Sequence, residues 1–163
     1  MIFASDLRAR TFTLLADARA KGVKIATAES CTGGLIAGLF TEIAGSSDVF
    51  ERGFVTYSND AKHEMLGVRQ SLLERHGAVS EEVARAMAEG ALKKSHADLA
   101  IAVTGIAGPG GGTETKPVGL VHMAAARKDG TVRHRICEFG DIGRTEVRLA
   151  TIDAALELLS ELV

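Results

Sequence analysis

The chain has 163 residues, of which 46% are hydrophobic, and a formal net charge of −2 at pH 7. This length is enough for one domain with its own hydrophobic core and is short for two. No segment carries a run of lysine and arginine, so the composition argues against a protein that binds nucleic acid or anionic membranes in general. Cys31 and Cys137 stand in no C-x-x-C pair, which argues against a disulfide scaffold or a structural zinc site.

The beginning of the chain lacks the features of a targeting segment. Residues 1–10 have no basic stretch before an apolar one, and no apolar run approaches the roughly 18 residues that a membrane span needs. We therefore expect a cytosolic protein without membrane association, folded as a single domain over residues 1–163.

Hydrophobic periodicity and turn residues divide the first half of the chain into helices and short strands. The predicted elements are a helix after Ser5 that ends at Gly22, a strand over 23–28, a helix over 33–43, a strand over 50–57 and a helix from Ser58 to Leu66. Gly22 is placed as a helix C-cap, and Ser58 is placed as an N-cap.

The second half continues this alternation and adds a hairpin. We expect a helical turn over 71–76, a helix after Ser80, a strand over 99–103, a glycine-rich loop over 105–117, strands over 118–126 and 131–139, and a last helix over 144–162. Asp129-Gly130 between the last two strands is a strong hairpin signal, so these strands should pair antiparallel. The pattern predicts an α/β fold, a three-layer α/β/α arrangement with a mixed sheet flanked by helices.

Hydroxyls and glycines crowd the turn Ser30-Cys31-Thr32-Gly33-Gly34, which lies between the first predicted strand and its helix. Glycines allow close approach of a ligand, and the free N–H groups of a helix N-terminus attract anions. One interpretation is therefore a phosphate site. The other is that Thr32 caps the helix while the glycines make a tight turn.

The glycine-rich loop matches neither of two familiar nucleotide-binding motifs. A P-loop requires Gly-Lys and then Ser or Thr before a helix, whereas Gly112 is followed by Thr113-Glu114 and a predicted strand. The dinucleotide spacing is also absent. A compact domain rarely carries so long a loop for structural reasons, so we expect a binding loop beside Thr104, with a disordered crossover as the alternative.

Catalytic chemistry without a metal cluster needs a nucleophile and a base. Hydroxyl and thiol nucleophiles are available at Ser30, Cys31, Ser46, Ser47 and Ser58. Lys62 follows Asn59 by three residues on a predicted helix, and a partly desolvated lysine can serve as a base, here with Tyr57 assisting. The alternative is a solvated Lys62 and a Tyr57 packed in the interior. The histidines show no triad spacing, and Ser30 lacks the flanking glycines of a nucleophile elbow.

Arg144 stands in the first turn of the last predicted helix, where a cation opposes the helix dipole. A ligand phosphate or carboxylate would account for it. The alternative is a surface cation paired with Asp141 or Glu146.

Several motifs follow one another in a fixed order, and together they resemble the CinA carboxy-terminal domain family over nearly the whole chain. They are Thr27-Ala28-Glu29-Ser30-Cys31-Thr32-Gly33-Gly34, Gly45-Ser46-Ser47, Arg52-Gly53-Phe54-Val55-Thr56-Tyr57-Ser58-Asn59-x-x-Lys62, His76-Gly77-Ala78-Val79-Ser80, Thr104-Gly105-Ile106-Ala107-Gly108-Pro109 and Lys116-Pro117-Val118-Gly119. The larger amino-terminal module of some relatives is absent, so the chain looks like the stand-alone form.

The resemblance implies a nicotinamide-mononucleotide deamidase, which converts its substrate and water to nicotinate mononucleotide and ammonia in pyridine-nucleotide recycling. It implies Ser47 as nucleophile, Lys62 as base and Tyr57 as an assisting hydroxyl. It implies no metal, and we expect no cofactor. A regulatory or interaction domain that binds a nucleotide without changing it, linked to competence or DNA damage, is the alternative.

The same resemblance places the mononucleotide at residues from three parts of the chain, with Thr104 or a glycine-loop amide as donor to the oxyanion. The expected substrate-binding residues are Ser30, Cys31, Thr32, Gly33, Gly34, Thr104, Gly105 and Arg144. We expect a homo-oligomer on general grounds, because small α/β enzymes often place sites near subunit contacts.

Overall fold

Five strands form one mixed sheet within residues 2–163, which are the residues that the computed structural model describes. The strands are β1 (Ile25–Glu29), β2 (Phe50–Val55), β3 (Leu99–Gly105), β4 (Leu120–Arg127) and β5 (Val132–Glu138). Their order is β2-β1-β3-β4-β5. β1 runs parallel to β2 and β3, whereas β4 runs antiparallel to β3 and β5, which confirms the predicted hairpin.

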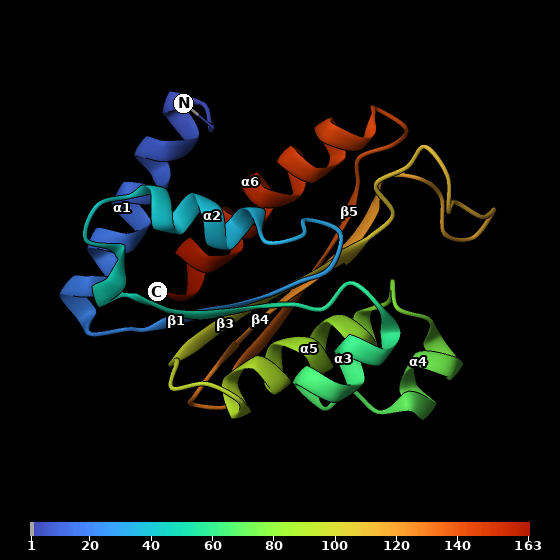
Figure 1. Ribbon diagram of the computed structural model, residues 1–163, viewed down its shortest axis with the longest axis horizontal. Coiled ribbons are helices and arrows are strands. Elements are labelled where there is room, and N and C mark those ends of the chain that lie inside the picture. The colour runs from blue at the N-terminus through green and yellow to red at the C-terminus, as the bar shows by residue number, and fades with distance from the viewer. Residues whose placement is uncertain (1) are drawn as a thin grey trace.

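Helices cover both faces of this sheet (Figure 1). On one face lie α1 (Ser5–Lys21), α2 (Leu35–Glu42) and α6 (Arg144–Leu162), and on the other lie α3 (Asn59–Leu66), α4 (Gln70–His76) and α5 (Glu81–Lys93). A short 3-10 helix, η1 (Ser46–Asp48), precedes β2. The predicted three-layer α/β/α fold with a mixed sheet is therefore confirmed.

The two faces of the sheet carry side chains of different size, because successive strand residues point to opposite sides. Toward α1, α2 and α6 the buried strand residues include Ile25, Ile101, Val103, Val121 and Met123. In the apolar cluster on the side of α5 the buried strand residues are all alanines, namely Ala26, Ala28, Ala100, Ala102, Ala124 and Ala126. A face of small side chains lets α5 pack close to the sheet.

The helices α5 and α3 also cross at close range. A Cβ atom at Gly90 of α5 would come within 2.1 Å of the Leu66 carbonyl oxygen, so this crossing requires glycine. The side chain of Ser58 accepts the Ala61 N–H at 3.0 Å and caps the start of α3, as predicted. These contacts fix the helix that carries Lys62.

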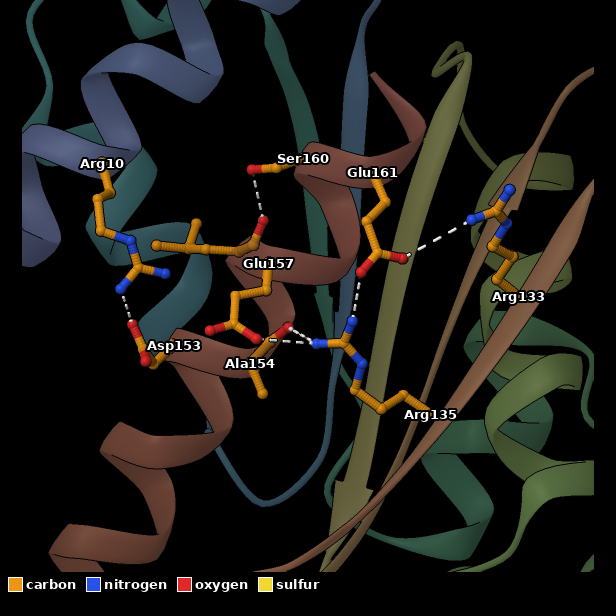
Figure 2. Close-up of polar contacts among 9 residues, drawn as sticks. Arg10, Arg133, Arg135, Asp153, Ala154, Glu157, Ser160 and Glu161 are labelled. Carbon is orange, nitrogen blue, oxygen red and sulfur yellow. Dashed lines mark hydrogen bonds and ion pairs between the residues drawn. The ribbon is translucent and has the colours of Figure 1, made fainter.

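Ion pairs join α6 to β5 and to α1 (Figure 2). Arg135 of β5 donates to Glu157 at 3.1 Å and to Glu161 at 2.6 Å, and Arg10 of α1 pairs with Asp153. Partly exposed pairs of this kind contribute at most about 1 kcal/mol each, so the buried apolar side of α6 holds it more strongly. Among residues 2–163, no helix combines the length and apolar character of a membrane span.

The carboxyl ends of the three parallel strands meet at one edge of the sheet. β1 ends just before Ser30, β2 just before Thr56, and β3 at Gly105. The antiparallel register brings the start of β4, the end of β5 and the start of α6 to the same edge. Open α/β sheets bind ligands at this edge, so it is the place to look for a site.

Candidate active site

A cavity of about 260 Å³ lies at this edge of the sheet. It is lined by Ser30, Cys31, Tyr57, Asn59, Lys62, Ala78, Val79, residues 104–108, Gly110, Gly111 and Arg144. The structure thus brings together seven of the residues expected in the site, which are Ser30, Cys31, Tyr57, Lys62, Thr104, Gly105 and Arg144.

Lys62 is buried in the wall of this cavity, with only 1% of its surface exposed. Its Nζ donates to Ser30 Oγ at 3.0 Å, to the Thr56 carbonyl oxygen at 2.9 Å and to the Tyr57 carbonyl oxygen at 3.4 Å. The alternative of a solvated helix lysine is therefore wrong, and the serine beside Lys62 is Ser30.

Burial lowers the pKa of Lys62 from 10.5 to about 8, and the nearby Cys31 only partly opposes this effect. A pKa in this range leaves a useful fraction of neutral amine near neutral pH. A neutral amine has two N–H groups, which can stay on the two carbonyl oxygens while the lone pair faces Ser30 Oγ. The geometry suits the transfer of the Ser30 proton to Lys62.

Cys31 also lines the cavity, but its chemistry does not suit a nucleophile. Burial raises the pKa of its thiol to about 11. The attacking form of cysteine is the thiolate, which is scarce at neutral pH when the pKa is this high.

Ser47 is exposed in η1, at the opposite edge of the sheet. The register pairs Phe50 with Ile25 and Val55 with Glu29, so the whole length of β2, roughly 20 Å, separates Ser47 from the cavity. Ser47 and Lys62 therefore do not meet, contrary to expectation.

The turn at Ser30 to Gly34 is built around the carboxylate of Glu29. This side chain is fully buried and accepts the Thr32 hydroxyl at 2.5 Å, the Ile36 N–H at 2.9 Å and the Ala37 N–H at 3.1 Å. The first N–H donors of α2 are thus already occupied. The end of the helix is therefore closed to an external anion, contrary to the phosphate interpretation. Glu29 takes the capping place expected of Thr32, whereas Gly33 and Gly34, with positive φ values of 59° and 99°, make the tight turn that the second interpretation expected.

Thr32, Gly33 and Gly34 consequently lie outside the lining of the cavity. Gly34 is the N-cap residue of α2, with a positive φ of 99° that favours glycine. Arg148 of α6 donates to the carbonyl oxygens of Cys31 at 3.1 Å and Thr32 at 3.2 Å. These glycines and this arginine shape the turn that presents Ser30.

Arg144 bridges two parts of the cavity rim. Its guanidinium donates to the Gly108 carbonyl oxygen at 2.8 Å and to the Tyr57 hydroxyl oxygen at 3.1 Å. It does not pair with Asp141 or Glu146, the alternative for this residue. Tyr57 is 63% exposed rather than packed inside, and its oxygen, which accepts from Arg144, still carries a proton to donate.

Thr104 and Gly105, the last residues of β3, line the cavity next to the glycine-rich loop. The Thr104 hydroxyl donates to the Ala78 carbonyl oxygen at 3.0 Å, so its proton is not free for an oxyanion. A Cβ atom at Gly105 would come within 2.6 Å of the Val121 side chain, which explains glycine at this position.

A larger hollow of about 810 Å³ lies on the other side of the glycine-rich loop and shares Gly110 and Gly111 with the cavity. Its charged lining residues are all acidic, namely Glu114, Glu138 and Asp141. Carboxylates repel phosphate, whereas the smaller cavity contains Lys62 and Arg144. The smaller cavity is therefore the candidate site.

Sequence reasoning missed several residues that build the site. Glu29, Asn59, Ala78 and Val79 occur in the sequence only as parts of the motifs, and a glutamate at the end of a buried strand gives no local sign of its partners. Within the described residues, no three His, Cys, Asp or Glu side chains are grouped to hold a metal ion.

Comparison with known proteins shows what this chain resembles. The model of the CinA C-terminal domain family matches residues 8–163. The nicotinamide-nucleotide amidohydrolase PncC of Escherichia coli strain K12 is 54% identical over 143 residues, which cover 86% of this chain and 85% of that protein. A crystal structure of the competence/damage inducible protein CihA from Agrobacterium tumefaciens has a TM-score of 0.97 and 56% identity, over 99% of this chain and 98% of that one.

Other relatives are much longer. A protein of Caldicellulosiruptor bescii whose name refers to competence-damage inducibility is 52% identical over 139 residues, which cover 85% of this chain and 33% of that protein. The chain spans about a third of the length of such relatives.

Proposed function

Because the chain belongs to the CinA C-terminal domain family, we propose that it is a nicotinamide-mononucleotide amidohydrolase. The contact of Lys62 Nζ with Ser30 Oγ at 3.0 Å carries this proposal, since it joins a buried amine to a hydroxyl in a cavity. The name of the Escherichia coli relative supports the substrate. We assign the reaction to pyridine-nucleotide recycling in the cytosol.

The first half-reaction acylates Ser30. Neutral Lys62 takes the hydroxyl proton while Ser30 Oγ attacks the carboxamide carbon of the substrate. The tetrahedral intermediate collapses, the carbon–nitrogen bond breaks, and the lysine ammonium returns its proton to the departing nitrogen. Ammonia leaves, and the pyridine carbonyl is held as an ester on Ser30.

The second half-reaction hydrolyses this ester. A water molecule gives a proton to Lys62 and attacks the ester carbonyl, and Ser30 leaves as its hydroxyl after it regains that proton. The products are nicotinate mononucleotide and free enzyme. One water is consumed and one ammonia released for each turnover.

Tyr57 and Arg144 take the remaining roles at the cavity rim. The Tyr57 hydroxyl can donate its proton to the oxyanion, because Arg144 already donates to its oxygen at 3.1 Å. A guanidinium has five N–H donors, so Arg144 has donors left for the substrate phosphate. Ser30 thus acts as nucleophile, and not as part of a phosphate cradle.

Ammonia release from nicotinamide mononucleotide tests the function and the nucleophile together. We expect Ser30→Ala to lose more than about a thousandfold in kcat and Ser47→Ala to stay within about threefold of the unmodified protein. The reverse result would move the nucleophile to Ser47. If calorimetry shows that the unmodified protein binds the nucleotide but no ammonia appears, the chain is a binding domain and not a hydrolase.

A further inference from the structure

The walls of the cavity come from segments that are distant in the sequence. One wall is the start of the glycine-rich loop of residues 105–117, and another is Ala78 and Val79 in the turn between α4 and α5. Thr104 joins this turn to β3 through the Ala78 carbonyl oxygen. These contacts do not hold the second half of the glycine-rich loop, so its position depends on a further contact.

Lys116 supplies that attachment. Its Nζ donates to the His76 carbonyl oxygen at 2.5 Å, at the end of α4. Its backbone is held in turn by Thr113, whose N–H donates to the Lys116 carbonyl oxygen at 2.8 Å and whose hydroxyl accepts the Lys116 N–H at 3.0 Å. The lysine is therefore fixed at both ends of its side chain.

The turn is shaped to receive this ammonium group. Gly77 has a positive φ of 75°, and a Cβ atom there would come within 2.8 Å of Lys116 Nζ. A side chain at this position would collide with the lysine in its present place. The positive φ of residue 77 and its short distance to Lys116 Nζ thus both favour glycine at this position.

The charge of Lys116 acts on a titratable side chain of the sheet, His122. His122 of β4 stacks on His134 of β5 with ring centroids 5.0 Å apart, and the two share a hydrogen bond of 2.8 Å. Burial, His134 and the Lys116 cation lower the pKa of His122, while Glu81 and Glu82 of α5 oppose them. His122 therefore reports on the position of Lys116.

We propose that Lys116 is a positioning residue, which ties the glycine-rich loop to the α4–α5 turn and so keeps the cavity in its binding shape. The effect on substrate rests on the proposed function. When a fraction of the molecules has the loop detached, the apparent affinity falls by that fraction. Lys116 touches no reacting atom, so the chemical step itself is unaffected.

The test replaces Lys116 with methionine, which keeps the length of the side chain and removes the ammonium group. Lys128→Met is the matched control, because Lys128 is exposed just after β4 at the opposite edge of the sheet. For nicotinamide mononucleotide we expect Lys116→Met to raise KM about tenfold and to leave kcat within about twofold. Thr113→Val, which removes the hydroxyl that accepts the Lys116 N–H, should act in the same direction.

Two measurements on the free protein separate this inference from the proposed function. Amide hydrogen exchange over residues 105–117 should accelerate about tenfold in Lys116→Met, and the pKa of His122 followed by NMR should rise. Lys128→Met should change neither. The rise in the pKa of His122 follows from the loss of the nearby charge and verifies only that the ammonium group is gone. If exchange over residues 105–117 is the same in Lys116→Met as in the unmodified protein, Lys116 does not hold the loop, whether or not ammonia is released.

Discussion

Replacement of the buried lysine, Lys62→Met, makes a sharp prediction about stability and pH. Below about pH 8 the folded protein holds Lys62 protonated in a buried position, whereas the unfolded chain holds it protonated in water. Between about 8 and 10.5 the folded protein has released this proton and the unfolded chain still holds it. The unfolded state then binds more protons, so the free energy of unfolding rises with pH across this window.

The magnitude follows from the two pKa values. The interval from about 8 to 10.5 corresponds to about 3 kcal/mol, at about 1.4 kcal/mol for each pH unit. Relative to Lys62→Met, the unmodified protein should therefore gain about 3 kcal/mol in the free energy of unfolding between pH 7 and pH 10.5. Loss of the contacts to Thr56 and Tyr57 shifts the variant by an amount that does not depend on pH, so it cancels in this comparison.

Urea denaturation at several pH values measures this difference. Groups that do not interact with Lys62 titrate alike in both proteins and drop out when one curve is subtracted from the other. Lys128→Met, which removes an exposed lysine, should show no such window. A difference between the unmodified protein and Lys62→Met that stays constant from pH 7 to pH 10.5 would refute the depressed pKa and, with it, the assignment of Lys62 as a base.

Four further predictions concern the same site. The value of kcat/KM for ammonia release should rise with pH and level off above about 8, as neutral Lys62 accumulates, and initial rates from pH 6 to 9.5 will show whether it does. Glu29→Gln should lower the free energy of unfolding by about 2 to 4 kcal/mol in urea denaturation, because the amide cannot accept all three buried hydrogen bonds. Arg144→Met should raise KM about 10- to 100-fold, because it loses the charge-assisted hydrogen bonds to substrate. Tyr57→Phe should instead lower kcat about tenfold or more, because it loses the donor to the oxyanion. Steady-state kinetics measures KM and kcat separately and so distinguishes the two effects.

Features that depend on neighbours in the sequence could be predicted. Ser58 and Ser80 each accept the N–H three residues ahead, as their positions before the helices suggested. Asp129-Gly130 joins two antiparallel strands, and the helix expected over residues 144–162 has those bounds. Caps and tight turns are decided by a few adjacent residues, so they carry over from sequence to structure.

The serine that meets Lys62 could not be predicted in this way. Ser30 lies just after β1 and Ser47 lies in η1 just before β2, and nothing nearby in the sequence distinguishes them. The sheet order decides between them, because β2 lies beside β1 in parallel and brings the ends of both strands together. Ser30 follows the end of β1, whereas Ser47 precedes the start of β2.

Glu29 changes where the phosphate of a substrate can bind. The N-terminus of α2 is the kind of helix end that attracts an anion, but the buried carboxylate of Glu29 already satisfies its donors. A second anion there would meet a negative charge and no free N–H. We therefore propose that the phosphate is held elsewhere, at Arg144 at the start of α6, which is the exposed cation lining the cavity. In the proposed reaction, recognition of the nucleotide then depends on α6, while the hydroxyl-rich turn after β1 holds Ser30 in place for attack.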